Sequence, residues 1–289
     1  MSYDTLDDRM KNAYEHRYRM YLPDRIPVII RLDGKAFHSF TRGLKKPFDA
    51  LFVKTMQDTM EYLCSNIQGC KFGYVESDEI SLCLWSWSKN ESDAWFGNNL
   101  QKMVSISASM AGVAFNRYWN RNVAEYLCAE YCSNCESLIT EEEDKYRTTI
   151  KNKAEMLMPV FDSRAFIIPA EEVHNYFVWR QNDCMRNSIQ GLAQSLYSER
   201  EIHCLNTSKL QNKMFSEKGV NWNDYSVVER RGTCIYKVPT KVIGLNGETV
   251  IRNKWTMDIN MPILSKPENK EFVTSKVFKN EYLYEPKKG

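Results

Sequence analysis

VIIRLDGKAFHSF, residues 28–40, carries an aspartate at the end of an apolar run, and GYVESDEISL, residues 73–82, carries another. The apolar residues around Asp33 and Asp78 predict that each aspartate lies on a β-strand. A carboxylate inside a sheet is costly unless it is paired or binds a cation. Two such carboxylates suit Mg²⁺, which takes one or two protein carboxylates and completes its shell with phosphate and water. The pair therefore predicts a magnesium-dependent nucleotidyl-transfer site on a polymerase-like palm.

The bulk composition is that of a globular protein with one large domain or two small ones. The chain has 289 residues and a formal net charge of +2, so a nucleic-acid surface would have to be local. Nine cysteines, an odd number without a framework pattern, favour reduced thiols and a cytoplasmic location. Neither an apolar signal core at the N-terminus nor a membrane span is expected.

The order of predicted elements favours an α+β fold of the ferredoxin-like palm type, an antiparallel sheet with helices on one face. Strands are expected at 27–33 and 160–168, a hairpin at 71–78 with 79–87, and helices at 49–66, 96–119 and 171–197. An insert at 120–158 interrupts this pattern. After residue 200 we expect a helix at 207–218 and a hairpin at 227–238 with 241–254. The predicted domains are a catalytic palm, 1–200, and a C-terminal extension packed on it, 201–289.

Each acidic motif also has a plainer interpretation. Asp33-Gly34 is equally typical of a turn that ends a strand, and the segment around Asp78 could be an exposed hairpin turn. No Gly or Asn supports that turn, and the two motifs together favour the metal site. The strand pleat would put Glu79 on the opposite face from Asp78.

Three cations could hold a triphosphate near these carboxylates. Arg31 lies two residues before Asp33, Lys46 follows in a short loop, and Lys102 lies on the second long helix. Each could equally be an ordinary surface residue.

The spacing Cys128-x3-Cys132-x2-Cys135 matches the cysteine triplet that binds an iron–sulfur cluster in radical enzymes, and three thiolates could also begin a zinc site. No fourth ligand is obvious, although His203 or Cys204 could approach. An insert without a ligand is the interpretation we favour.

The motifs together resemble the tRNA-histidine guanylyltransferase family, which includes relatives that act as 3′–5′ polymerases and repair tRNA 5′ ends. The resemblance rests on residues 31–38, on Lys46-Pro47 and on Ser77-Asp78-Glu79, and it continues in WRQNDC, residues 179–184. It covers roughly residues 5–238, and it places this chain nearest to the repair relatives.

The resemblance implies two Mg²⁺ ions held by Asp33, the Gly34 carbonyl and Asp78, with Glu79 in a supporting catalytic role. It implies ATP and GTP as substrates, tRNA as partner and a homotetramer. The residues that it places at the nucleotide or triphosphate are Arg31, Lys35, Ala36, Phe37, His38, Leu44, Lys46, Asp49, Ser77, Lys102 and Asn187.

Two departures favour template-directed repair over dedicated guanylate addition. Residues 185–188, MRNS, replace a His-x-x-Asn-type run of the eukaryotic enzymes, and the loop between His38 and Lys46 is shorter. Two other classes stay open: a nucleotide cyclase or cyclic-dinucleotide synthase on the same palm, and a non-catalytic RNA-binding protein.

Overall fold

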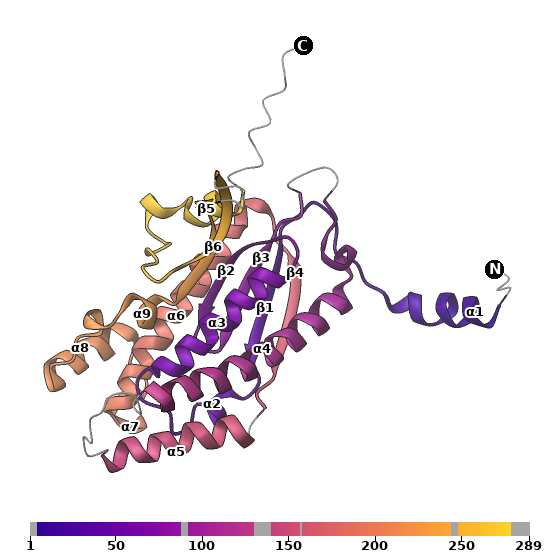
Figure 1. Cartoon of the computed structure of the whole chain (residues 1–289). Helices are drawn as coiled ribbons and strands as arrows, with labels where there is room; N and C mark the ends of the chain where they lie inside the picture. Colours follow the sequence, from indigo (N-terminus) through magenta and orange to yellow (C-terminus); the bar gives the residue numbers. More distant parts are fainter. Residues whose placement is uncertain (1–4, 88–91, 130–139, 157, 244–247, 279–289) are drawn as a thin grey trace.

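In the computed structural model, which describes residues 5–87, 92–129, 140–156, 158–243 and 248–278, a single six-stranded sheet organises the chain (Figure 1). The strand order is β4-β1-β3-β2-β5-β6, and every neighbouring pair is antiparallel. The first four strands have the ferredoxin-like order, so the predicted palm is confirmed. The strands are β1 Val28–Gly34, β2 Cys70–Glu76, β3 Glu79–Leu84, β4 Phe161–Ile167, β5 Thr233–Ile243 and β6 Thr249–Asp258.

Helices flank this sheet and fill its connections. The α-helices are α1 Leu6–Ala13, α2 Phe37–Phe40, α3 Ala50–Asn66, α4 Leu100–Ala129, α5 Glu141–Met156, α6 Val173–Leu196, α7 Glu199–Ile202, α8 Thr207–Lys218, α9 Val227–Arg231 and α10 Phe272–Val277. Short 3₁₀ turns lie at Glu15–Tyr18, Trp95–Asn98, Ala170–Glu172, Trp222–Asp224 and Pro267–Asn269. Among the described residues, no helix is both long enough and apolar enough to cross a bilayer.

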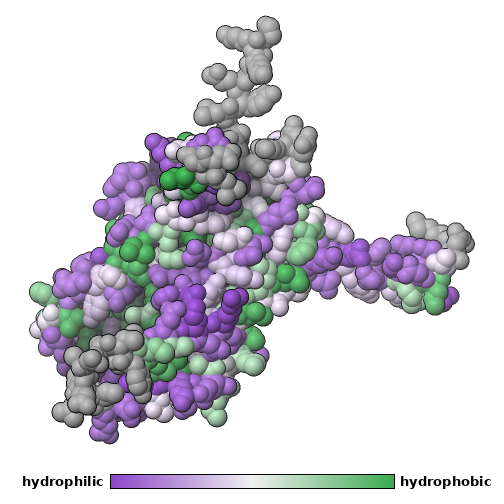
Figure 2. Space-filling view, viewed as in Figure 1, coloured by the Kyte–Doolittle hydropathy of each residue, from purple (hydrophilic) through white to green (hydrophobic). Residues whose placement is uncertain are grey.

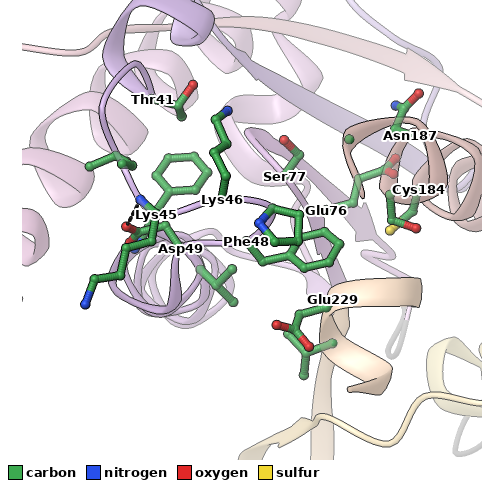
Figure 3. Close-up of a pocket in the computed structure, with 17 residues that line it drawn as sticks. Thr41, Lys45, Lys46, Phe48, Asp49, Glu76, Ser77, Cys184, Asn187 and Glu229 are labelled. Atoms are coloured by element: carbon green, nitrogen blue, oxygen red, sulfur yellow. Dashed lines mark hydrogen bonds between the residues drawn. The ribbon is translucent and has the colours of Figure 1, made fainter. Parts of the chain in front are cut away.

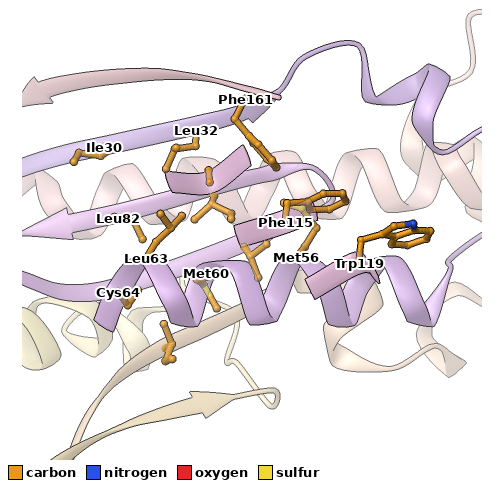
Figure 4. Close-up of a cluster of buried hydrophobic side chains, with 14 of the residues drawn as sticks. Ile30, Leu32, Met56, Met60, Leu63, Cys64, Leu82, Phe115, Trp119 and Phe161 are labelled. Atoms are coloured by element: carbon orange, nitrogen blue, oxygen red, sulfur yellow. The ribbon is translucent and has the colours of Figure 1, made fainter. Parts of the chain in front are cut away.

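Both faces of the sheet are covered, so the expectation of helices on one face was incomplete. Ile30 and Leu32 of β1 pack with α3 and α4 in the larger core, part of which is drawn in Figure 4. Ile29 points the other way and packs with Phe177 of α6 in a second core. Successive strand residues alternate between faces, and apolar residues on both faces require a helix layer on each.

The segment predicted as an insert is largely helical and belongs to the larger core. Helix α4 continues ten residues beyond the predicted end at 119, and α5 follows within the described residues. Tyr146 and Ile150 of α5 are buried against the same aromatic cluster as Trp119. Because these contacts are made only in the folded chain, the local pattern did not reveal them.

The predicted strand at 227–238 begins six residues late. Residues 227–231 form α9 instead, because Ser226 and Glu229 make a reciprocal capping box. Gly232 then has a positive φ of 73°, and a Cβ there would lie 2.5 Å from the Val75 carbonyl oxygen. The close approach lets β5 pair with β2 and extend the palm sheet.

Candidate active site

Asp33 and Asp78 lie at the same end of the sheet, at the end of β1 and between β2 and β3. Asp78 lies in a two-residue turn rather than on a strand, contrary to the sequence prediction. Ser77, the first turn residue, has a φ of +48°, a conformation that is uncommon for a residue with a side chain. The Gly34 N–H donates to the Asp78 carbonyl oxygen at 3.1 Å, which ties the end of β1 to this turn.

The two aspartates line one cavity of about 460 Å³, which we call the carboxylate cleft. Its walls also include Arg31, Trp179, Arg186 and Asn187. The strand, the turn and α6 therefore all contribute side chains to a single opening.

The electrostatics of this cleft fit a bound divalent cation. Burial raises the pKa of Asp78 and the charge of Asp33 raises it further, while the Ser77 hydroxyl and His38 oppose these effects. A cation between two carboxylates removes their mutual repulsion. Among the described residues, no group of three or more His, Cys, Asp or Glu side chains could hold a metal. Two carboxylates completed by phosphate and water are a donor set that suits Mg²⁺.

Gly34 is required for packing beside the two aspartates. A Cβ at this residue would lie 2.3 Å from the Phe37 ring. Phe37 is 2% exposed and packs against Phe115 and Phe161. Phe37 was predicted to lie at the nucleotide, and because its ring is buried, its backbone is the part that a ligand could reach.

Glu79 is occupied by cations and does not join the aspartates in a three-carboxylate cluster. It lies on the α6 face of β3, and its Oε1 is 2.7 Å from Arg180 Nε while its Oε2 is 3.4 Å from Arg31 Nε. The role that this geometry supports is positioning. The pleat argument does not carry this role, because Asp78 lies in a turn and Glu79 is the cross-strand partner of Asp33.

Arg180 of α6 holds both strands that flank the Ser77-Asp78 turn. Its Nη2 donates to Glu76 at 3.0 Å and to Asp183 at 2.8 Å, and its side chain is only 6% exposed. Burial alone would lower the pKa of Arg180, but the carboxylates of Glu76, Glu79 and Asp183 raise it overall. Sequence reasoning missed this function of Arg180, although an arginine three residues before an aspartate in WRQNDC was a usable signal.

A second cavity of about 220 Å³ adjoins the cleft, and we call it the apolar pocket (Figure 3). Phe48 and Val53 provide apolar walls, Lys46 a cation, and Val228 of α9 a contribution from the C-terminal region. Ser77, Glu76 and Asn187 line both cavities, so a ligand in the pocket can extend toward the aspartates. Sequence reasoning missed Phe48, Cys184 and Val228, because only the folded chain brings them together.

The other predicted nucleotide residues fall into three groups. Leu44, Lys46, Asp49, Ser77 and Asn187 line the apolar pocket, and Arg31 lines the carboxylate cleft. Lys35 and Ala36 are exposed in the turn after β1, where Ala36 has a φ of 55°, and His38 is exposed on α2. Lys102 lines neither cavity and lies 5.9 Å from the centre of the Phe96 ring.

Asp49 lines the apolar pocket and also stabilises the start of α3. Its carboxylate caps α3 by accepting from the Phe52 N–H at 2.9 Å, and it also accepts from Lys45 N and Tyr146 Oη. Asp49 is therefore the N-cap of α3.

The cysteine motif is only partly described. Cys128 is exposed and free at the end of α4, while Cys132 and Cys135 lie outside the described residues. Cys204, the suggested fourth ligand, is also exposed and free.

A palm sheet with a carboxylate pair beside a base-sized pocket defines the chain as a nucleotidyltransferase of the polymerase-palm type. Residues 7–169 match the family model described as "Thg1: tRNAHis guanylyltransferase". The chain belongs to the tRNAHis guanylyltransferase family.

Comparisons with individual proteins agree with this placement. A bacterial tRNA(His) guanylyltransferase (Thg1)-like protein solved in complex with ATP is 36% identical, with a TM-score of 0.75 over 94% of this chain and 99% of that one. The complex with GTP gives 36% identity and a TM-score of 0.71 over 95% and 100%. The tRNA(His) guanylyltransferase of Debaryomyces hansenii is 26% identical over 76% of this chain and 77% of its own length.

Proposed function

We propose that this protein adds nucleotides in the 3′–5′ direction to the 5′ end of a tRNA, with an opposing template base selecting each nucleotide. The observation that carries the proposal is the adjacency of the two cavities. The apolar pocket suits a purine base, and the carboxylate cleft next to it contains the two aspartates. The ATP and GTP complexes of the bacterial relative support a purine nucleotide as the ligand.

Different side chains of the two cavities would bind phosphate, bind metal and orient the nucleotide. Lys46 and Arg31 would neutralise phosphate charge. Asp33, the Gly34 carbonyl and Asp78 would hold two Mg²⁺ ions. When bound, these ions would supply charge that favours ionisation of the attacking 3′-hydroxyl and departure of pyrophosphate or AMP. Ser77 and Asn187 would orient the nucleotide, since each lines both cavities.

The test for the site is Asp78→Asn, because this change removes one negative charge and leaves the size of the side chain almost unchanged. We expect loss of nucleotide addition with an unchanged circular dichroism spectrum and melting temperature. A well-folded Asp78→Asn protein that still incorporates nucleotides in a magnesium-dependent way contradicts the assignment.

The test for template direction uses purified protein, Mg²⁺, labelled nucleoside triphosphates and a set of 5′-trimmed tRNAs. Incorporation that follows the opposing base supports repair. Guanylate added regardless of that base would instead identify dedicated guanylate addition. Cyclic product from GTP or ATP without RNA would identify the cyclase alternative, and tRNA binding without turnover would identify a non-catalytic binding protein.

We further propose a homotetramer in the cytoplasm. Helix α1 has no buried residues and stands away from the sheet, with Leu6 and Met10 exposed (Figure 1). The face shown in Figure 2 is mainly hydrophilic with small hydrophobic areas. A projecting arm with exposed apolar side chains suits contact with another subunit, and light scattering of the purified protein tests this.

A further inference from the structure

Trp179 is a large aromatic side chain that lines the carboxylate cleft and is about half exposed to solvent. It is 52% exposed, and it is the sole aromatic residue among the described residues that line the carboxylate cleft. Exposed tryptophans are unusual, because the side chain gains more than most from burial.

The ring of Trp179 is held in place by its neighbours. Tyr176, one turn earlier on α6, meets it edge-on with ring centres 5.8 Å apart. The guanidinium carbon of Arg180 lies 4.4 Å from the ring centre, and that of Arg31 lies 5.9 Å away. Helix α6 is anchored in the second core by Val173, Tyr176 and Phe177, and the contacts with Tyr176 and Arg180 favour one orientation of the ring.

The reaction brings a second base into this cleft besides that of the incoming nucleotide. The reacting phosphorus at the RNA 5′ end must lie at Asp33 and Asp78, so the base of that nucleotide lies within one nucleotide's length of them. The apolar pocket has its own wall for the incoming base, formed with Phe48. The ring of Trp179 is therefore available to a base of the RNA. Arg31 and Arg186 line the same cleft, where their charges would attract the RNA backbone.

We propose that Trp179 is the stacking surface for the 5′-terminal base of the RNA. Stacking on an aromatic ring tolerates every base, because every base has a π-face, and this suits an enzyme that extends ends of different sequence. The inference rests on the proposed function, and it adds a recognition residue to it.

The experiment replaces Trp179 by Leu, which keeps an apolar cover over Arg180, and by Phe, which keeps an aromatic face. The matched control is Trp87→Leu, an exposed tryptophan that lies outside the cleft. Binding is measured without nucleoside triphosphates, from the fluorescence quenching of a tRNA with 2-aminopurine at its 5′ end. The KM values for tRNA and for the nucleoside triphosphate are measured separately.

We expect Trp179→Leu to lose the quenching and to raise the KM for tRNA by about 5- to 150-fold, the range for one stacked base, with an unchanged KM for the nucleoside triphosphate. Trp179→Phe and Trp87→Leu should remain close to the original protein. The proposal is overturned if Trp179→Leu behaves as the original protein, if Leu and Phe are equally defective, or if only the KM for the nucleoside triphosphate rises. A parent protein that quenches the probe but extends no RNA contradicts the proposed function, not the stacking surface.

Discussion

Replacing Arg180 with Met removes the cation that joins α6 to both strands that flank the Ser77-Asp78 turn. The side chain of Arg180 is 6% exposed, and that of its partner Glu76 is 4% exposed. Methionine has a similar length and no charge, so the change leaves Glu76 and Glu79 buried without their shared partner.

The expected cost follows from this burial. Removing one partner of a buried ion pair costs about 3–5 kcal/mol, because the remaining charge has lost both water and its partner. The nearby Arg186 serves as a control, because its ion pair is exposed to solvent. It also binds Asp183, but its side chain is 57% exposed, so Arg186→Met should change the free energy of unfolding by no more than about 0.5 kcal/mol.

The assay is urea unfolding of the two variants at pH 9, above the pKa of about 8 of Glu76, so that Glu76 is ionised in the original protein. Nucleotide addition is then measured under conditions where each variant is folded. Arg180→Met should also reduce addition by about 10- to 100-fold, because the two strands that flank the Ser77-Asp78 turn lose the side chain that joins them. Adding Glu76→Gln and Glu79→Gln to Arg180→Met should recover much of the lost stability, because no unpaired charge then remains. A loss below about 1 kcal/mol for Arg180→Met would refute the reasoning.

Two further predictions concern the same region. Burial raises the pKa of Glu76 to about 8 from an ordinary value of 4.5, so its contribution to stability is complete below about pH 4.5 and is lost as the pH rises through 8. Urea unfolding between pH 5 and 9 should therefore show the original protein losing stability relative to Glu76→Gln, and parallel curves would contradict this. Gly34→Ala should cost about 1–3 kcal/mol by overpacking against Phe37. The control Gly191→Ala, whose Cβ would meet nothing within 4 Å on α6, should gain about 0.5–1 kcal/mol, and equal effects of the two changes would exclude the packing explanation.

Much of the palm was predictable, because its elements carry strong local signals. The apolar run before Asp33 and the helical spacing after Asp49 each specify an element within a few residues. The errors arose where a local pattern competed with contacts made elsewhere. Residues 227–231 resemble a strand until the cap formed by Ser226 is considered, and α5 resembles an insert until Tyr146 meets the core.

The candidate site was predictable in its acidic residues but not in its surroundings. Carboxylates beside apolar strand residues can be recognised in the sequence, because a charge is costly in an apolar surrounding unless it has a partner. The groups that hold them are not visible in this way, and Arg180 and Trp179 lie about one hundred residues from Asp78. The prediction for Lys102 stays a prediction, since this residue lines neither of the two cavities.

The sequence by itself determined the strand and helix order of the palm and the two aspartates, because periodicity and the cost of a buried charge act over short stretches of chain. Only the tertiary structure decided that Asp78 lies in a turn, that α6 covers the second face, and that Arg180 joins Glu76 to Glu79. The physical reason is that ion pairs and cavities depend on distances across the sheet, which the order of residues along the chain does not specify.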